Sequence, residues 1–358
     1  MSFIDFNLQL TPRTFFKWTL LKGISVLYLV LVQLWLLAYR LGIKKSRSID
    51  TAVVSIGNIT TGGTGKTPMV SWIMDHCELR KIKVAVLTRG YGAKPKAAFQ
   101  ILNSDTAAHG DSGVFGDEPW MLFHNHRKSA IYISADRFFA ASQASTEHDL
   151  LVLDDGMQHL RLERDLNIVL IDASTGIGNG QIIPLGPLRE PLRSLKRADA
   201  VIYTKTNLAD PAPTMAVVRS YLTDGVPQFN SEYKPVGLIP FENQAGIKLE
   251  EIQGKKCFLI SGIGNPASFA DVVRQAGGSV VGHEILPDHH RYEESSIKEI
   301  VAISADVNYD FLICTEKDWV KLELWRDQLP KGWYLKMEMV IDPGFQSLLD
   351  SWIDEHLP

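Results

Sequence analysis

The clearest chemical pattern in the chain is a glycine-rich run that follows the apolar stretch Val53–Gly57. Its residues are Thr61, Gly62, Gly63, Thr64, Gly65, Lys66 and Thr67. Glycines let backbone N–H groups converge on an anion, because no Cβ blocks the approach, and the N-terminus of a following helix adds partial positive charge. In such a loop Lys66 would reach the β- and γ-phosphates of ATP, and the Thr67 hydroxyl would hold Mg²⁺. Thr60 stands where the usual pattern has glycine, and the alternative is a glycine-rich turn without a ligand.

Two adjacent carboxylates form the second pattern. Four apolar residues from Leu150 are followed by Asp154 and Asp155, and then by the sequence Gly-Met-Gln-His. Acids at the carboxyl end of a parallel strand lie beside a phosphate-binding loop and can hold Mg²⁺ or its waters. We therefore predict a metal role for Asp154 and Asp155.

Three further groups allow more than one interpretation. Asp117, in the sequence Gly-Asp-Glu-Pro, is either a helix cap or an acid that faces the phosphates. Arg189, between prolines, either contacts phosphate or lies in a surface loop. The tripeptide from Asp288 to His290 is a metal pair, a solvated turn or a carboxylate–histidine site that titrates near neutral pH.

A long uncharged segment precedes these motifs. The 17 residues from Gly23 to Tyr39 would form a helix of about 26 Å at ~1.5 Å per residue, slightly short of a hydrocarbon core of about 30 Å. Seven basic residues flank it: Arg13, Lys17, Lys22, Arg40, Lys44, Lys45 and Arg47. Such flanks favour an anionic membrane face, so we expect a helix that lies in, or dips into, the cytoplasmic leaflet. The alternative is a buried core helix.

Composition restricts the class of protein. The chain has 358 residues, enough for two ordinary domains, and a formal net charge of −4. No overall basic field suggests nucleic acid as a partner. The three cysteines are scattered, which fits neither a disulfide framework nor a metal cluster.

Apolar runs that alternate with helical segments predict the elements that position these residues. We expect strands at 83–88, 130–134, 150–153, 167–172 and 200–204, and a loop over 93–116. This order predicts an α/β fold with a P-loop NTPase-like parallel sheet flanked by helices. A second, smaller α/β/α domain is expected after it. The domain boundaries are 1–50 for the membrane-associated helix, 51–227 for the P-loop domain and 228–358 for the smaller domain.

The order of the motifs adds a resemblance. Besides the glycine-rich loop, the motifs are Arg89–Gly92, Gly116–Pro119, Asp154–His159, Pro187–Glu190, Asp288–His290 and Thr315–Asp318. In this order they resemble the tetraacyldisaccharide 4′-kinase family of lipid A biosynthesis in Gram-negative bacteria. The resemblance implies transfer of the γ-phosphoryl group of ATP to the 4′-hydroxyl of tetraacyldisaccharide 1-phosphate, which forms lipid IVA. It also implies two α/β/α units joined by a two-stranded link, with ATP between them, at the cytoplasmic face of the inner membrane.

The resemblance also suggests residue roles. Asp117 would accept the proton of the 4′-hydroxyl, and His289 would pair with Asp117 and orient it. Tyr91 and Arg189 would help to hold the phosphates or the substrate. Glu190 joins Thr67, Asp154 and Asp155 as a candidate Mg²⁺ ligand. The expected partners are the lipid substrate and inner-membrane lipids, with no nucleic acid, and we expect a monomer.

The strongest rival is a membrane-associated P-loop ATPase that acts as a molecular switch. Such ATPases place a lysine just before the glycine pair, and this chain has Thr61 there. A switch should hydrolyse ATP without a sugar acceptor, whereas a kinase requires one.

Overall fold

The computed structural model describes residues 12–90, 98–242, 245–288 and 290–357. The chain divides into two compact units. The first contains residues 1–89, 134–232 and 340–358, and the second contains residues 90–133 and 233–339. The strands β8 (Gln228–Pro240) and β12 (Trp333–Ile341) contribute residues to both units.

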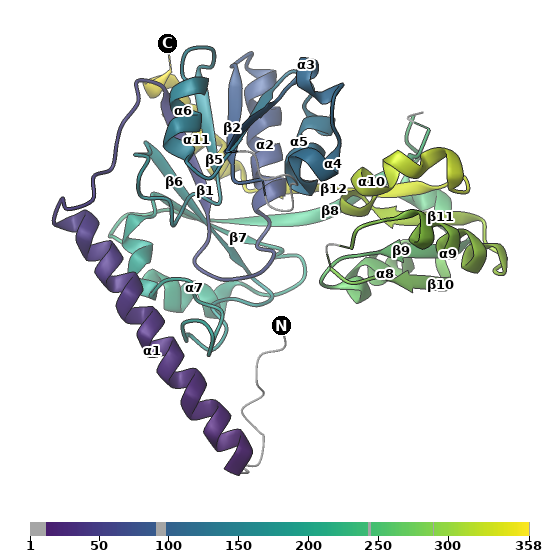
Figure 1. Ribbon diagram of the computed structural model, residues 1–358, viewed down its shortest axis with the longest axis horizontal. Coiled ribbons are helices and arrows are strands. Elements are labelled where there is room, and N and C mark those ends of the chain that lie inside the picture. The colour runs from purple at the N-terminus through teal and green to yellow at the C-terminus, as the bar shows by residue number, and fades with distance from the viewer. Residues whose placement is uncertain (1–11, 91–97, 243–244, 289, 358) are drawn as a thin grey trace. The chain divides into compact units, whose positions relative to one another are not determined.

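The first unit is built on a parallel sheet in the order β7-β6-β1-β5-β2 (Figure 1). Its strands are β1 (Ala52–Gly57), β2 (Val84–Thr88), β5 (Leu150–Asp154), β6 (Leu166–Asp172) and β7 (Ala200–Thr204). Nearly every residue of these strands is buried, as expected for a parallel sheet covered on both faces. The predicted α/β fold with a parallel sheet is confirmed.

Besides the N-terminal helix, the first unit contains further helical segments. They are α2 (Lys66–Leu79), α6 (Arg137–Ala144), α7 (Ala212–Arg219), α11 (Pro343–His356) and the 3₁₀ turn η1 (Leu192–Arg197). α2 follows β1 directly through the glycine-rich loop. Because β1 lies at the centre of the sheet, its carboxyl end brings this loop beside the ends of β5 and β6.

The N-terminal helix α1 (Pro12–Arg40) matches the predicted apolar segment. Over Trp18–Arg40 it is long and apolar enough to cross a membrane, and only 6% of its most apolar window is buried. The alternative of a buried core helix is therefore wrong. This apolar helix indicates membrane association.

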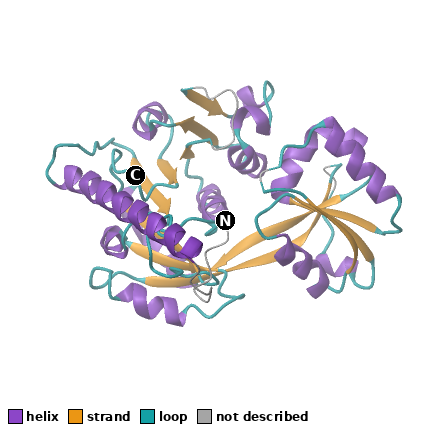
Figure 2. Cartoon of the chain, turned by 60° about the horizontal axis from the view of Figure 1, so that its bottom comes forward, coloured by secondary structure: helices purple, strands orange, loops and turns teal. Residues whose placement is uncertain are grey.

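The second unit contains another parallel set of strands, with helices on both sides (Figure 2). The parallel strands are ordered β10-β9-β11-β12, and β8 comes next in the sheet. Here β9 is Lys256–Ser261, β10 is Ser279–Ile285 and β11 is Phe311–Thr315. The helices are α5 (Asp117–Asn125), α8 (Pro266–Gln275), α9 (Glu294–Ala305) and α10 (Glu316–Leu322), with the 3₁₀ turns η2 (Leu249–Ile252) and η3 (Glu323–Gln328). Phe241, Phe258 and Trp319 lie in its core.

One predicted loop is wrong. Over residues 98–116 the chain forms β3 (Phe99–Leu102), α3 (Ser104–Ala107) and α4 (Ser112–Phe115), and α5 and β4 (Ala130–Ser134) follow. The side chains of Asn103 and Asp111 cap the two short helices, so polar residues that suggested a loop act as helix starts. Residues 90–133 group with the second unit, whereas the sequence assigned them to the P-loop domain. The domain boundaries themselves stay a prediction.

Candidate active site

The glycine-rich loop has the backbone geometry that an anion site requires. Gly62 and Gly65 adopt φ values of +109° and +83°, which side chains with a Cβ rarely allow. A Cβ on Gly57 would lie 2.5 Å from the Cβ of Met157, so the turn also needs glycine there. Gly65 precedes α2 without a side-chain cap, and the N–H groups of the first turn therefore suit an anion.

Polar residues at the ends of β1 and β7 hold this loop from outside. Asn58 Nδ2 donates to Thr64 Oγ1 at 2.8 Å, and Thr204 Oγ1 donates to the Thr64 carbonyl at 3.0 Å. Lys205 Nζ donates to the Gly63 carbonyl at 2.9 Å and also pairs with Asp172. The sequence analysis missed these residues. A signal was present, because each polar residue directly follows or ends a strand at the same sheet edge.

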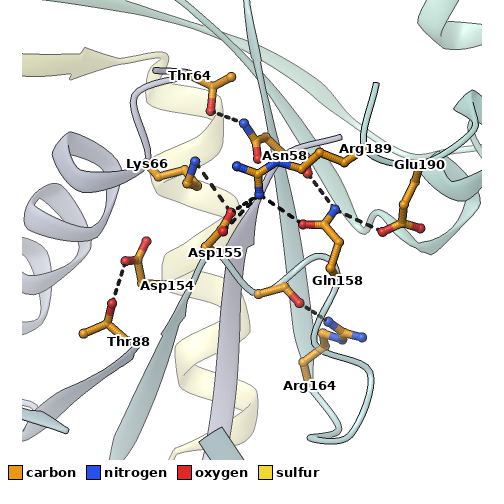
Figure 3. Close-up of polar contacts among 11 residues, drawn as sticks. Asn58, Thr64, Lys66, Thr88, Asp154, Asp155, Gln158, Arg164, Arg189 and Glu190 are labelled. Atoms are coloured by element: carbon orange, nitrogen blue, oxygen red, sulfur yellow. Dashed lines mark hydrogen bonds and ion pairs between the residues drawn. The ribbon is translucent and has the colours of Figure 1, made fainter. Parts of the chain in front are cut away.

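Asp155 is the centre of the charged cluster at the loop (Figure 3). Arg189 Nη1 lies 2.9 Å from each Asp155 carboxylate oxygen, and Lys66 Nζ lies 3.6 Å from Oδ1. Burial alone would raise the pKa of Asp155, but the charges of Lys66 and Arg189 outweigh it and lower that pKa. Asp155 also adopts φ +50°, an uncommon conformation of the kind that recurs at functional sites. Three residues chosen from the sequence thus meet here.

The other predicted metal ligands lie around Asp155. Asp154, 5% exposed, accepts a hydrogen bond from Thr88 Oγ1 at 3.1 Å, and Thr67 is the second residue of α2. Glu190, 1% exposed, accepts from Arg197 at 2.7 Å and from Gln158 at 3.0 Å, one on each oxygen. Among the described residues, no group of three or more His, Cys, Asp and Glu side chains is arranged to hold a metal ion.

The segment with Arg189 is not a separate surface loop. The Arg189 N–H donates to the Ile59 carbonyl, and the Thr61 N–H donates to the Pro187 carbonyl, both at 2.7 Å. These bonds form a short antiparallel bridge between the segment and the phosphate loop. Arg189 is therefore fixed at the cluster by its backbone as well as by its side chain.

The loop after Asp155 lies in a strongly cationic environment. Arg164 Nη1 donates to the Gly156 carbonyl at 2.7 Å, and burial followed by the charge of Arg197 lowers the pKa of Arg164 to about 10. Burial and the charge of Arg137 lower the pKa of His159 to about 4. His159 is consequently neutral at physiological pH.

Comparisons with known proteins identify the family of this chain. The sequence profile of the family described as "Tetraacyldisaccharide-1-P 4'-kinase" matches residues 17–354. The chain belongs to this family. It is 34% identical to the tetraacyldisaccharide 4'-kinase of Pelobacter propionicus over 91% of this chain and 90% of that protein. It is 36% identical to the kinase of the same name from Pseudomonas aeruginosa PAO1, over 88% and 87% of the two chains.

A solved structure supports the fold. The crystal structure of "apo" form LpxK from Aquifex aeolicus in complex with ATP aligns with a TM-score of 0.77 at 24% identity. The alignment covers 95% of this chain and 99% of that chain. The resemblance drawn from the ordered motifs is confirmed, and this protein is a phosphotransferase of lipid A biosynthesis. The alternative of a switch ATPase is wrong.

In this kinase Asp117 belongs to the second unit and is the first residue of α5. The N-cap position is taken by Gly116, which has no side chain, so the interpretation of Asp117 as a helix cap is wrong. His289 and Tyr91 lie outside the described residues, and their predicted roles stay predictions.

The motif Thr315–Asp318 organises the second unit of the kinase. The Asp318 carboxylate accepts hydrogen bonds from Thr315 Oγ1 at 2.6 Å, the Gly262 N–H at 3.0 Å and the Tyr292 hydroxyl at 3.0 Å. Lys321 Nζ lies 3.3 Å from the same carboxylate. Asp318 thus ties together three segments of this unit, at Gly262, Tyr292 and Thr315.

Proposed function

We propose that this kinase transfers the γ-phosphoryl group of ATP to the 4′-hydroxyl of tetraacyldisaccharide 1-phosphate and so forms lipid IVA. The family match and the names of the relatives support the substrate. The observation that carries the proposal is the cluster of Lys66, Asp155 and Arg189 at the glycine-rich N-terminus of α2. Phosphoryl transfer needs such a site because catalysis is mainly positioning and charge neutralisation.

Within the first unit, the loop amides and Lys66 would hold the phosphates. The 3.6 Å pair between Lys66 and Asp155 is loose enough for Lys66 to exchange its partner for phosphate oxygens. Thr67, Asp154 and Asp155 supply hard oxygen ligands that fit Mg²⁺, which when bound would neutralise charge on the phosphoryl oxygens. Glu190 is also kept as a candidate, although direct ligation would displace Gln158 or Arg197 from it.

Asp117 is proposed as the general base that accepts the 4′-hydroxyl proton, and His289 as the residue that orients it. Asp117 is the first residue of α5, and the place of its Gly-Asp-Glu-Pro motif in the order of the family motifs supports this role. Tyr91 and Arg189 are proposed to hold phosphates or substrate. For Arg189, the support is its fixed place beside Asp155.

The apolar helix α1 is proposed to lie in the cytoplasmic leaflet of the inner membrane, where a lipid with four acyl chains would be found. Ser25 and Tyr28 of α1 hydrogen bond to backbone carbonyls of the first unit. A helix that crossed the bilayer alone would have lipid around these residues, so the bonds support an interfacial helix. Basic residues after Arg40 would contact anionic headgroups. We propose that the kinase works as a monomer.

The test is transfer of radiolabelled phosphate from ATP-Mg²⁺ to tetraacyldisaccharide 1-phosphate in detergent micelles. Wild-type protein should label the lipid, and Asp117→Ala should lower kcat by about 10²–10⁴-fold with little change in ATP binding. Asp105→Ala, which removes an exposed acid of the second unit, is the control and should retain activity. Equal losses in kcat and ATP binding would contradict the base assignment. Absence of labelled lipid with the wild type would contradict the substrate.

A further inference from the structure

Ser25 and Tyr28 of α1 both bond to one segment of the first unit. Ser25, which is buried, donates from Oγ to the Ile182 carbonyl at 2.9 Å. The Tyr28 hydroxyl donates to the Arg189 carbonyl at 3.1 Å. Residues three apart share a helix face, so Ser25 and Tyr28 define the protein-facing side of α1. We call residues 182–190 the bridging segment.

The bridging segment continues directly to the nucleotide-binding residues. On its other side it pairs with the phosphate loop through the two 2.7 Å bonds at Ile59 and Thr61. The Arg189 side chain reaches Asp155. A continuous row of hydrogen bonds therefore runs from α1 through the Arg189 backbone to the phosphate loop and the acidic cluster.

Apolar packing strengthens the same connection. Tyr28 and Leu29 pack against a buried cluster that includes Ile59, Ile182 and Leu188. This cluster has residues from the phosphate loop and from both ends of the bridging segment. Movement of α1 would therefore disturb the core beneath the loop as well as the hydrogen bonds.

The opposite face of α1 is apolar and exposed. Its side chains recur every three to four residues, at Leu20, Ile24, Leu27, Leu31 and Leu34. This spacing forms one stripe along a helix. In the proposed membrane position, this stripe of α1 would face the bilayer, while Ser25 and Tyr28 bond to the first unit. Figure 1 shows the course of α1.

The surroundings of Tyr28 keep its hydroxyl protonated, as a hydrogen-bond donor must be. Burial raises the pKa of Tyr28, and the nearby Glu190 carboxylate raises it further, against a smaller lowering by Arg189. The hydroxyl therefore keeps its proton at physiological pH and can donate to the Arg189 carbonyl.

We propose that Tyr28, assisted by Ser25, is a positioning residue that couples the membrane-bound helix to phosphoryl transfer by fixing the bridging segment and Arg189. The proposal rests on the proposed function, because its readout is transfer to the lipid. Neither residue touches substrate in this proposal. Both act through the backbone on which Arg189 and the phosphate loop depend.

The first test is Tyr28→Phe in the full-length enzyme, assayed in mixed micelles. This change keeps the ring and its packing and removes one hydrogen bond, so kcat should fall about fivefold to tenfold. The KM for lipid, binding to micelles and the melting temperature should stay unchanged. Tyr39→Phe is the matched control on the same helix. Its ring stacks edge-on against Trp35, and its hydroxyl has no hydrogen-bond partner among the described residues, so this variant should keep wild-type kcat.

The second test asks whether Tyr28 acts through Arg189. The rate of Arg189→Met is measured in single-turnover assays. In this background Tyr28→Phe should lower the rate less than about twofold, because the effects of substitutions in one network are not additive. If Tyr28→Phe still lowered the rate fivefold to tenfold in that background, the proposal would be overturned. An unchanged kcat in the single variant Tyr28→Phe would also overturn it. Loss of micelle binding would also overturn it, since Tyr28 would then serve anchoring only. If the wild type labels no lipid, the proposed function fails instead, which is a distinguishable result.

Discussion

Two parallel strands of this kinase are followed by acidic residues that have opposite environments. β5 ends at Asp154 and continues to Asp155, whose side chain is 36% exposed and pairs with Lys66 and Arg189. β11 ends at Thr315 and continues to Asp318, which is 0% exposed and is surrounded by donors from its own unit. From sequence, both are carboxylates that follow an apolar run.

The two carboxylates differ in whether their partners are free to bind a ligand instead. Asp318 is satisfied by short local bonds that need no ligand, so its role is to hold loops together. Asp155 is held by the cations of Lys66 and Arg189, which in the proposed function would exchange to phosphate, and it adopts an uncommon backbone conformation. An acid at a strand end therefore indicates a site only when its partners are exchangeable.

Among the substitutions that test this comparison, Asp155→Asn should have the largest effect on activity. The change removes the negative charge that faces Lys66 and Arg189, and kcat should fall about 10³-fold, as for loss of a main electrostatic contact. The melting temperature should move by no more than about 2 °C, because the side chain is partly exposed. Glu163→Gln, at an exposed acid of the same unit, should leave kcat unchanged. A large loss of stability with normal kcat would reverse the comparison.

The next effect comes from Asp318→Ala and concerns stability. The substitution leaves buried donors at Gly262, Thr315 and Tyr292 without their acceptor, and should lower the free energy of unfolding by about 3 kcal/mol. Thermal unfolding in detergent measures the change. Asp318→Asn, which keeps an acceptor oxygen, should cost less. An unchanged melting temperature combined with a lost kcat would mean that Asp318 has a chemical role.

The smallest effect concerns His159, four residues beyond Asp155. Its folded-state pKa of about 4 lies below the usual value near 6.5, so between these pH values the unfolded chain binds more protons. Stability contributed by this residue is consequently lost as pH falls from about 6.5 towards 4. His159→Gln cannot titrate, and should reduce the loss of unfolding free energy between pH 7 and pH 5 by on the order of 1 kcal/mol. His109→Gln, at an exposed histidine, is the control. If wild type and His159→Gln had the same dependence of unfolding free energy on pH, the cationic environment described for this loop would be contradicted.

Local patterns predicted many of the strands. The strands at Ala130–Ser134 and Ala200–Thr204 have the predicted bounds, and β1, β5 and β6 lie at their predicted places. These runs are apolar and short, and their signal depends only on neighbours in sequence. The loop expected over residues 93–116 failed for the same reason: short helices there depend on caps at Asn103 and Asp111, which resemble loop residues in composition.

By itself, the sequence determined the phosphate loop, the acids at the end of β5, the motif with Arg189 and the apolar helix, because each is a run of residue types whose chemistry is local. Only the tertiary structure decided that Arg189 meets Asp155, that Lys205 holds the phosphate loop and that Asp318 is structural. It also decided which face of α1 meets the rest of the first unit. Ser25 and Tyr28 bond to Ile182 and Arg189, which lie 157 and 161 positions further along the chain. Such contacts depend on the order of the strands in the sheet and on which distant segments are buried together. Neither produces a periodic pattern in the sequence.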